Sequence, residues 1–373
     1  MKSMFKKIVS AVVVLALLAT SMLSLASCGD KLFEDDTIKI GATGPLSGDA
    51  ASYGISVQNG AKLAVKHLNE KDGIKFSFAI LDDKAGVEDA STNYDTLYDA
   101  GMQISLGGVT SGSGEAFAKK GNADKVFCMT PSGSADPVIK DMPYSYRLCF
   151  GDPDQGTVAA QEIKNGGYTK VGAIYDNSDP YSSGIYAAFK TEMAALGIEY
   201  IETSFDKDNK TDFSTQVNAL KDCDIIFMPF YYNEAQLFIQ QAKASTNAVF
   251  FGCDGFDGIA SYIENVDNKV MYITPFDAAS TKQNVVDFVA AYEAEYGKTP
   301  DQFAADAYDV VMVLADAIAK AGVTDVNISA EELANKVIAV ITAADYSYSG
   351  LTGDMKWVVT GECTKAPNIV VFD

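Results

Sequence analysis

The chain has 373 residues and a formal net charge of −21, and 48% of its residues are hydrophobic. This length is too great for one compact core and fits two globular domains. Its basic residues are almost all lysine, with Arg147 the only arginine, and this shortage disfavours a nucleic acid, an anionic membrane surface or a polyphosphate as partner.

The N-terminus has the pattern of an export signal. Three lysines within the first seven residues precede an apolar run at residues 8–26, and Leu-Ala-Ser stands directly before Cys28. A basic start, an apolar segment and small residues before a cleavage point are typical of a signal peptide. The four residues Leu-Ala-Ser-Cys that end at Cys28 resemble a bacterial lipobox. We therefore expect a signal peptide at 1–27, a lipid on Cys28 and a polar tether at 28–36. An ordinary signal peptide or an uncleaved anchor is the alternative.

Apolar strands and amphipathic helices alternate from residue 37 onward. In the first half we expect strands at 38–42, 75–81, 103–107, 126–130 and 146–150, and helices at 52–70, 87–100 and 113–120. A second series has strands at 171–175, 199–204, 224–229, 249–252 and 269–273, and helices at 155–164, 181–196, 213–220 and 234–243. Further helices are expected at 281–297, 302–321 and 331–341, and a β-ribbon at 355–359 and 368–372. This order predicts an α/β fold with two doubly wound, mostly parallel sheets.

Five cysteines follow Cys28, and their pattern disfavours a metal or redox site. They are Cys128, Cys149, Cys223, Cys253 and Cys363. Their number is odd, no two form a Cys-x-x-Cys pair, and several fall inside expected strands. We expect buried free thiols, although one disulfide stays open for an exported protein.

Residue patterns typical of catalysis are missing from the sequence. His67 is the only histidine and lies in the first amphipathic helix, so a triad would depend on it alone. The chain has no Gly-x-Ser-x-Gly elbow and no phosphate-binding loop, and Gly107–Gly112 lacks the spacing of a dinucleotide fingerprint. The pair Asp82-Asp83 at a strand end is more typical of a solvated turn than of a Mg²⁺ site. We therefore expect no enzyme, no cofactor and no metal.

Polar and aromatic side chains gather at the carboxyl ends of the expected strands, where open α/β sheets bind ligands. The first half supplies hydroxyl groups and helix-start amides, which suit a carboxylate, and the second supplies an acid among tyrosines, which suits an ammonium group. An α-amino acid meets both demands. The residues concerned are Ser111, Ser132 and Ser134 in the first half and Tyr181, Tyr231 and Asp254 in the second.

From residue 37 to its end, the chain resembles the branched-chain amino-acid (Leu/Ile/Val) binding proteins of ABC transporters. The resemblance rests on Ile38–Gly48, Tyr53-Gly54, Gly60–Ala64, Asp82-Asp83, Asp212–Ser214 and Ala307–Asp309. It implies a type I periplasmic binding protein, in which two Rossmann-like domains are joined by a three-strand hinge. The lobes would comprise residues 37–150 with 277–347, and 151–276 with 348–373, with crossings near 150–154, 274–277 and 348–353.

The resemblance also implies a role for each candidate ligand-binding residue. Ser111 and Ser134 would bind the α-carboxylate through their hydroxyls, Ser132 through its backbone, and Asp254 would pair with the ammonium group. The ligand side chain would be enclosed by Tyr53, Val109, Tyr181, Tyr231 and Phe303.

Several of these positions depart from the family pattern. The best-known members have Glu at the position of Asp254, alanine at Ser132 and threonine at Ser134. Pro180 resembles an insertion just before Tyr181, and the cysteines of a first-domain disulfide are missing.

Together these features predict a monomeric, lipid-anchored receptor on the outer face of the bacterial cytoplasmic membrane. It would capture an aliphatic L-amino acid by cleft closure and deliver it to a permease and its ATPase. A related ligand, such as an amide, urea or a polar amino acid, is one alternative, and a sensory domain for a signalling partner is another.

Overall fold

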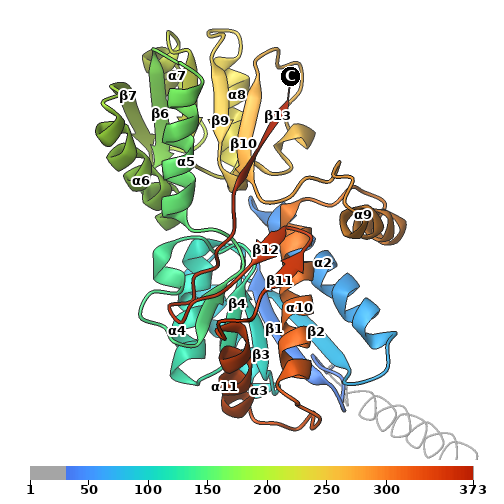
Figure 1. Cartoon of the computed structure of the whole chain (residues 1–373). Coiled ribbons are helices and arrows are strands. Elements are labelled where there is room, and N and C mark those ends of the chain that lie inside the picture. The colour runs from blue at the N-terminus through green and yellow to red at the C-terminus, as the bar shows by residue number, and fades with distance from the viewer. Residues whose placement is uncertain (1–30, 373) are drawn as a thin grey trace, which may run out of the picture.

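A strand that is buried on both faces needs helices above and below it. In the computed structural model, which describes residues 31–372, the strands and helices form two lobes, each built around one largely parallel sheet. The lobes stand one above the other, and the last strand of the chain returns to the upper lobe (Figure 1). The expected α/β class with two doubly wound sheets is confirmed.

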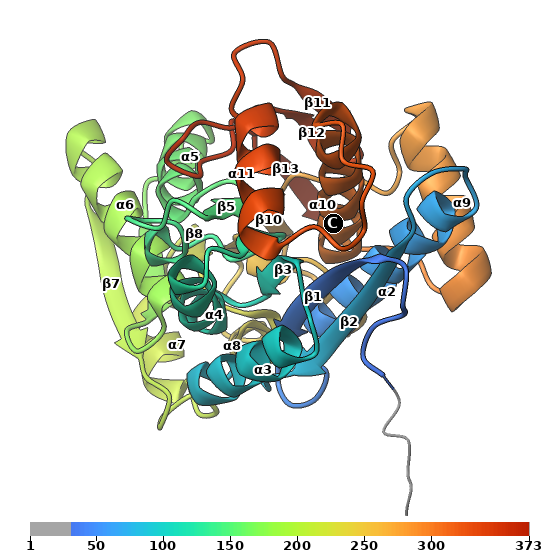
Figure 2. The same ribbon diagram turned by 90° about the horizontal axis from the view of Figure 1, so that it is seen from below.

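The first lobe contains a five-stranded parallel sheet in the order β2-β1-β3-β4-β5. Its strands are β1 (Ile38–Gly44), β2 (Phe76–Asp82), β3 (Ile104–Gly108), β4 (Phe127–Thr130) and β5 (Ser145–Arg147). One face is covered by α3 (Val87–Asp99) and α4 (Ser111–Ala123), and the other by α2 (Ala51–Asn69), α10 (Gln302–Lys320) and α11 (Ala330–Ile341) (Figure 2). Because both faces are covered, every residue of β3 and β4 is buried.

The second lobe contains a six-stranded sheet in the order β13-β10-β9-β8-β6-β7. Its parallel strands are β6 (Val171–Asp176), β7 (Tyr200–Phe205), β8 (Ile225–Met228), β9 (Val249–Gly252) and β10 (Val270–Thr274), and β13 (Asn368–Phe372) runs antiparallel to β10. Helices α5 (Asp152–Asn165) and α6 (Pro180–Leu196) pack together over one face, and α7 (Ser214–Leu220) and α8 (Tyr232–Ala242) cover the other. The remaining helix, α9 (Gln283–Tyr296), packs beside α2 of the first lobe.

The C-terminal tail differs from the expected ribbon between residues 355–359 and 368–372. A short hairpin forms instead between β11 (Tyr348–Gly350) and β12 (Gly353–Met355). Strand β13 pairs with β10, whose outer edge would otherwise leave its backbone N–H and C=O groups unpaired.

The third crossing between the lobes also lies later than the expected 348–353. Asp309 in α10 accepts the backbone N–H groups of Leu351 and Thr352, each at 2.9 Å, so the hairpin is held on the first lobe. Lys365 forms an ion pair with Asp306 of the same helix. The chain therefore leaves the first lobe only after residue 365 and joins the second sheet at Asn368.

Arg147 fastens this tail to the first sheet. Its guanidinium is buried and donates from Nε to Glu362 Oε2 at 2.9 Å, and its backbone carbonyl accepts from Trp357 Nε1 at 2.8 Å. The only arginine of the chain thus has a structural role, which its isolated position in the sequence did not indicate.

The described part of the expected tether is not free of the first lobe. Phe33 is buried in a cluster with Tyr94 and Leu97 of α3, so residues 33–36 belong to the folded lobe. The expected signal peptide at 1–27 and the lipidated Cys28 lie outside the described residues. Within residues 31–372, no helix is both long enough and apolar enough to cross a membrane. The five cysteines in that range are buried and none forms a disulfide.

Candidate ligand site between the lobes

Residues from both lobes meet at the carboxyl ends of the two sheets and enclose one small cavity. Eight of the nine candidate ligand-binding residues line it: Tyr53, Val109, Ser111, Ser132 and Phe303 from the first lobe, and Tyr181, Tyr231 and Asp254 from the second. The cavity measures about 10 Å³, which is room for about one water molecule. The lobes are thus closed on each other, and a larger ligand enters only if they separate or the aromatic rings turn.

The hydroxyl side of the cavity is built on the start of α4. Ser111 is the first residue of this helix, where backbone N–H groups have no partner within the helix and favour an anion. Its Oγ accepts a hydrogen bond from the backbone N–H of Ala135 at 3.2 Å, which ties it to the next strand-end loop. The preceding turn needs Gly108, because a Cβ there would lie 2.6 Å from the backbone nitrogen of Gly114.

Thr130 shapes the second strand-end loop of this side. Its Oγ1 accepts from the backbone N–H of Gly133 and donates to the carbonyl of Gly108, both at 2.8 Å. Ser132 is thereby placed at the cavity, where its hydroxyl donates to the carbonyl of Val109 at 2.7 Å. Ser132 thus presents its backbone to the cavity with its own hydroxyl already engaged.

Ser134 is the candidate residue that does not line the closed cavity. It is fully buried, and its carbonyl accepts from the backbone N–H of Asp152 at 3.0 Å and from the Arg147 guanidinium. Its hydroxyl faces the carboxyl of Asp152 and lowers the pKa of that carboxyl, against the larger effect of burial. The side chain therefore lies beside the cavity, on the side of the first crossing between the lobes.

Asp254 is the acid of the second lobe. It begins a short 3-10 turn after β9, and the Tyr181 hydroxyl donates to its Oδ1 at 2.6 Å. Its backbone N–H donates to Gln155 Oε1 at 3.0 Å. Burial raises the pKa of the Asp254 carboxyl to about 6, although the contacts with Tyr181 and Gln155 oppose the shift. A cation placed next to this carboxyl would favour its charged form.

Two capped helix starts place the aromatic walls. Asp179 caps α6 by accepting from Ser182 N at 3.0 Å, and Pro180 occupies the first helical position, which its fixed φ suits. Pro180 therefore starts the helix, and Tyr181 follows it into the cavity. In the same way Asp301 caps α10 just before Phe303.

The aromatic rings pack against one another across the cavity. The centroids of Tyr53 and Phe303 are 4.3 Å apart, and Tyr181 stacks on Tyr231 at 4.9 Å with an interplanar angle of 11°. The Tyr53 and Tyr231 rings meet edge to face at 5.6 Å. These rings fill the space that an apolar ligand side chain would occupy.

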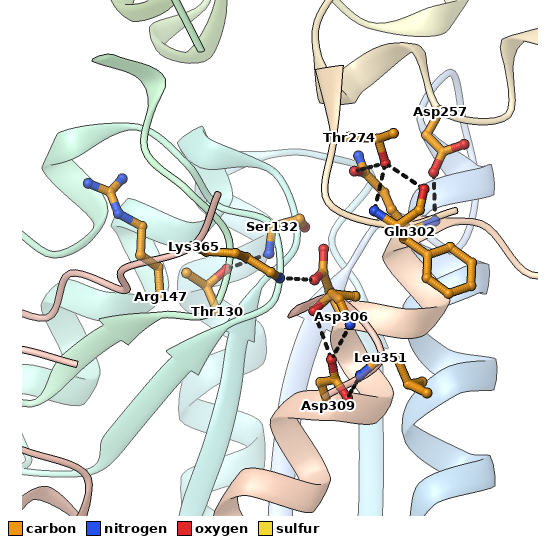
Figure 3. A network of polar contacts seen from close by, with 12 residues as sticks. Thr130, Ser132, Arg147, Asp257, Thr274, Gln302, Asp306, Asp309, Leu351 and Lys365 are labelled. Atoms are coloured by element: carbon orange, nitrogen blue, oxygen red, sulfur yellow. Dashed lines mark hydrogen bonds and ion pairs between the residues drawn. The ribbon is translucent and has the colours of Figure 1, made fainter. Parts of the chain in front are cut away.

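Polar contacts also join the lobes around the cavity. The Tyr53 hydroxyl donates to the carbonyl of Gly255 at 2.5 Å and accepts from Tyr232 N at 3.0 Å. Gln302, at the start of α10, donates from Nε2 to the Asp254 carbonyl at 2.7 Å. Its backbone N–H donates to Asp257 at 2.6 Å (Figure 3). The closed arrangement is therefore held by specific hydrogen bonds between the lobes.

An ion pair closes the outer rim of the cleft. Lys210 Nζ of the second lobe lies 3.0 Å from Asp49 of the first lobe and 3.0 Å from Glu234 of its own. Glu234 is nearly buried and Asp49 is mostly exposed. The Lys210–Glu234 ion pair is therefore shielded from dissolved salt, whereas the Lys210–Asp49 ion pair is not.

No local sequence pattern singles out Gln155, Gln302 or Lys210. A buried glutamine looks like any surface glutamine until the fold brings a partner to it, and Lys210 lies in a polar loop like many others. Both glutamines lie in the first turn of a helix, and this position is the only available signal. Within residues 31–372, no group of three histidine, cysteine or acidic side chains could hold a metal ion.

Comparison with known proteins decides the family. A family model described as periplasmic binding protein matches residues 37–365. The chain belongs to the periplasmic binding proteins. This periplasmic binding protein is 29% identical over 294 residues to a Leu/Ile/Val-binding protein from Rhizobium johnstonii, with 76% of this chain and 80% of the relative covered.

Two solved structures are also similar to this periplasmic binding protein. A leucine-binding protein from Thermotoga maritima has a TM-score of 0.79 at 25% identity, with 90% of this chain and 95% of the other covered. A branched-chain amino acid transporter substrate-binding protein from Streptococcus pneumoniae, in complex with isoleucine, has a TM-score of 0.76 at 25% identity, with 90% and 100% covered. The expected family and its type I fold are confirmed. Its members are extracytoplasmic, bind small molecules for ABC permeases and are not enzymes.

Proposed function

We propose that this periplasmic binding protein captures an aliphatic L-α-amino acid between its lobes and delivers it to an ABC permease and its ATPase. One observation carries the proposal: an anion-binding helix start with hydroxyls and a buried acid face each other across one cavity lined by aromatic rings. The carboxylate of the amino acid would bind at the start of α4, beside Ser111 and the backbone of Ser132. Its ammonium group would pair with Asp254, and its side chain would lie among the rings.

The mechanism is closure of the lobes around the ligand. A ligand that touches both lobes stabilises the closed form in proportion to its differential affinity for that form. The three segments between the lobes would act as the hinge. Because the cavity of the closed form is small, the rings of Tyr53 and Tyr231 must give way to the ligand side chain. Shape at this point would set the preference among aliphatic side chains.

The ligand class is tested by a thermal-shift screen followed by calorimetric titration. We expect leucine, isoleucine or valine to raise the melting temperature, with a dissociation constant in the micromolar range, about −8 kcal/mol. Glutamate, lysine and sugars should not raise the melting temperature, because the cavity lining contains a single acid, Asp254, and no lysine or arginine. A saturating shift with a sugar and none with an amino acid would contradict the proposal.

We further propose that the protein is a lipoprotein, anchored through Cys28 to the outer face of the membrane. The Leu-Ala-Ser sequence before this cysteine supports the proposal. Cys28→Ala should move the protein from the membrane fraction to the soluble fraction, because the lipid is its only expected anchor. Ligand affinity should stay unchanged, since the folded lobes begin later in the chain. A Cys28→Ala protein that still sediments with membranes would indicate an uncleaved helix.

A further inference from the structure

Lys210 connects the two lobes at the outer rim of the cleft. It lies in the segment between β7 and α7 of the second lobe, and its Nζ is 3.0 Å from Oδ2 of Asp49, just before α2 of the first lobe. The same ammonium group is 3.0 Å from Oε1 of Glu234, in the first turn of α8 of its own lobe. Among residues 31–372, Lys210–Asp49 is the one ion pair that joins the two lobes.

The ion pair with Glu234 holds Lys210 in position within the second lobe. The Glu234 side chain is 9% exposed, whereas that of Asp49 is 64% exposed. A nearly buried carboxylate without a cation is costly, so Glu234 should keep its lysine when the lobes separate. Burial lowers the pKa of Lys210, but the contacts with Asp49 and Glu234 outweigh burial and raise this pKa above its ordinary value. A charged Lys210 therefore faces the first lobe before closure and loses little side-chain freedom when it meets Asp49.

The three ionic side chains lie outside the ligand cavity, next to a larger chamber. Lys210, Asp49 and Glu234 all line this outer chamber of about 480 Å³, and none of them lines the ligand cavity. Tyr231 lines both spaces, so its ring lies between the ligand cavity and the chamber. A ligand that leaves on this side passes the Tyr231 ring and then the Lys210–Asp49 ion pair. Since Lys210 does not reach the ligand cavity, its effect on binding would act through closure of the lobes.

We propose that Lys210 is a positioning residue that sets how long the closed form lasts: Glu234 directs its ammonium group across the cleft, and Asp49 binds it only after closure. This inference rests on the proposed function, capture of an amino acid by lobe closure. Because the contact forms after the ligand has entered, its loss should raise the dissociation rate constant. Leucine carries no net charge and is not steered by a rim charge, so the association rate constant should stay nearly unchanged.

The test is stopped-flow measurement of leucine binding, followed through the fluorescence of the tyrosines around the cavity. Asp49→Asn should raise the dissociation rate constant by about 2–5-fold, the range that a partly exposed ion pair gives. Lys210→Met should raise it at least as much, and the double variant should be no faster than Lys210→Met, because both changes remove the same contact. Lys210→Arg, which keeps the charge, should restore slow dissociation.

A matched control is Lys190→Met. The Lys190–Glu202 ion pair has the same 3.0 Å separation and is likewise partly exposed, but both residues belong to the second lobe. Closure does not change this contact, so leucine should dissociate from Lys190→Met at the wild-type rate. Salt gives a second readout, because it screens exposed charges. A rise in salt should speed dissociation from wild-type protein more than from Asp49→Asn.

The stability of the ligand-free protein separates this role from a structural one. Because the Asp49 side chain is mostly exposed, ligand-free Asp49→Asn should melt at the wild-type temperature. A wild-type dissociation rate in Asp49→Asn, a change confined to association, or a clear drop in its melting temperature would overturn the inference while leaving the proposed function intact. If wild-type protein binds no amino acid, the proposed function fails, and this inference fails with it.

Discussion

Asp254→Asn should weaken amino-acid binding more than Ser111→Ala does, with both proteins still folded. In the closed cleft the ligand ammonium group is out of water, and a buried charge that loses its partner is costly. Truncating one member of a buried, hydrogen-bonded charge pair costs about 2–5 kcal/mol. Asparagine keeps the volume of the side chain and its bond from the Tyr181 hydroxyl, so the loss would report on charge alone.

Ser111→Ala removes a neutral donor from a carboxylate that keeps the backbone amides at the start of α4. About 1–3 kcal/mol of binding free energy is expected to be lost. The Ala135 N–H also loses its acceptor, but this change affects the free and the bound protein alike. Calorimetric titration of both variants measures the order, and circular dichroism verifies their folding. Near-wild-type affinity in Asp254→Asn would show that the ammonium group binds elsewhere.

The clustering of the candidate ligand-binding residues within each lobe could be predicted, because it follows from the geometry of parallel sheets. In such a sheet the loops after the strands all emerge at one edge, so Ser111 and Ser132 had to lie close together. Asp254 follows a strand of the second sheet and meets them because the carboxyl ends of the two sheets face each other. The helix caps before Tyr181 and Phe303 are also local features of the sequence, and each fixes a wall of the cavity.

The remaining features depend on contacts between distant residues, which local patterns do not encode. The third crossing lies later in the chain than expected, because Asp306, Asp309 and Arg147 of the first lobe bind the preceding segment. Ser134 lies outside the cavity lining because its loop packs against the first turn of α5, where the backbone N–H of Asp152 donates to the Ser134 carbonyl. The sequence shows that these residues are polar, but it does not show which hydrogen-bond or ion-pair partners they have in the fold.

Just before its third crossing, the chain forms a buried ion pair that is expected to contribute strongly to stability. Lys365 Nζ lies 2.6 Å from Asp306 Oδ1, and their side chains are 0% and 3% exposed (Figure 3). Lys365→Met should lower the free energy of unfolding by about 3–5 kcal/mol, because the carboxyl of Asp306 stays buried without its cation. Urea denaturation followed by circular dichroism measures this loss.

Two further variants show whether the loss comes from the unpaired charge. Lys365→Met combined with Asp306→Leu should recover most of the stability, since apolar side chains can replace a buried ion pair at little cost. Lys320→Met is the control, because the Lys320–Asp316 pair is partly exposed and should contribute less than about 1 kcal/mol. Additive losses in the double variant would contradict this account.

The pH dependence of Lys365→Met provides an independent check with a definite sign. Burial raises the pKa of Asp306, and Lys365 lowers it most, with a smaller contribution from the Thr352 hydroxyl. Without the lysine, the folded-state pKa would lie further above the unfolded value, so stability would be retained at low pH and lost as the pH rises through the folded-state pKa. The deficit of Lys365→Met relative to wild type should therefore be smaller at pH 5 than at pH 8. A deficit that is equal at both pH values would mean that lost packing around the lysine stem, rather than the stranded carboxylate, destabilises the variant.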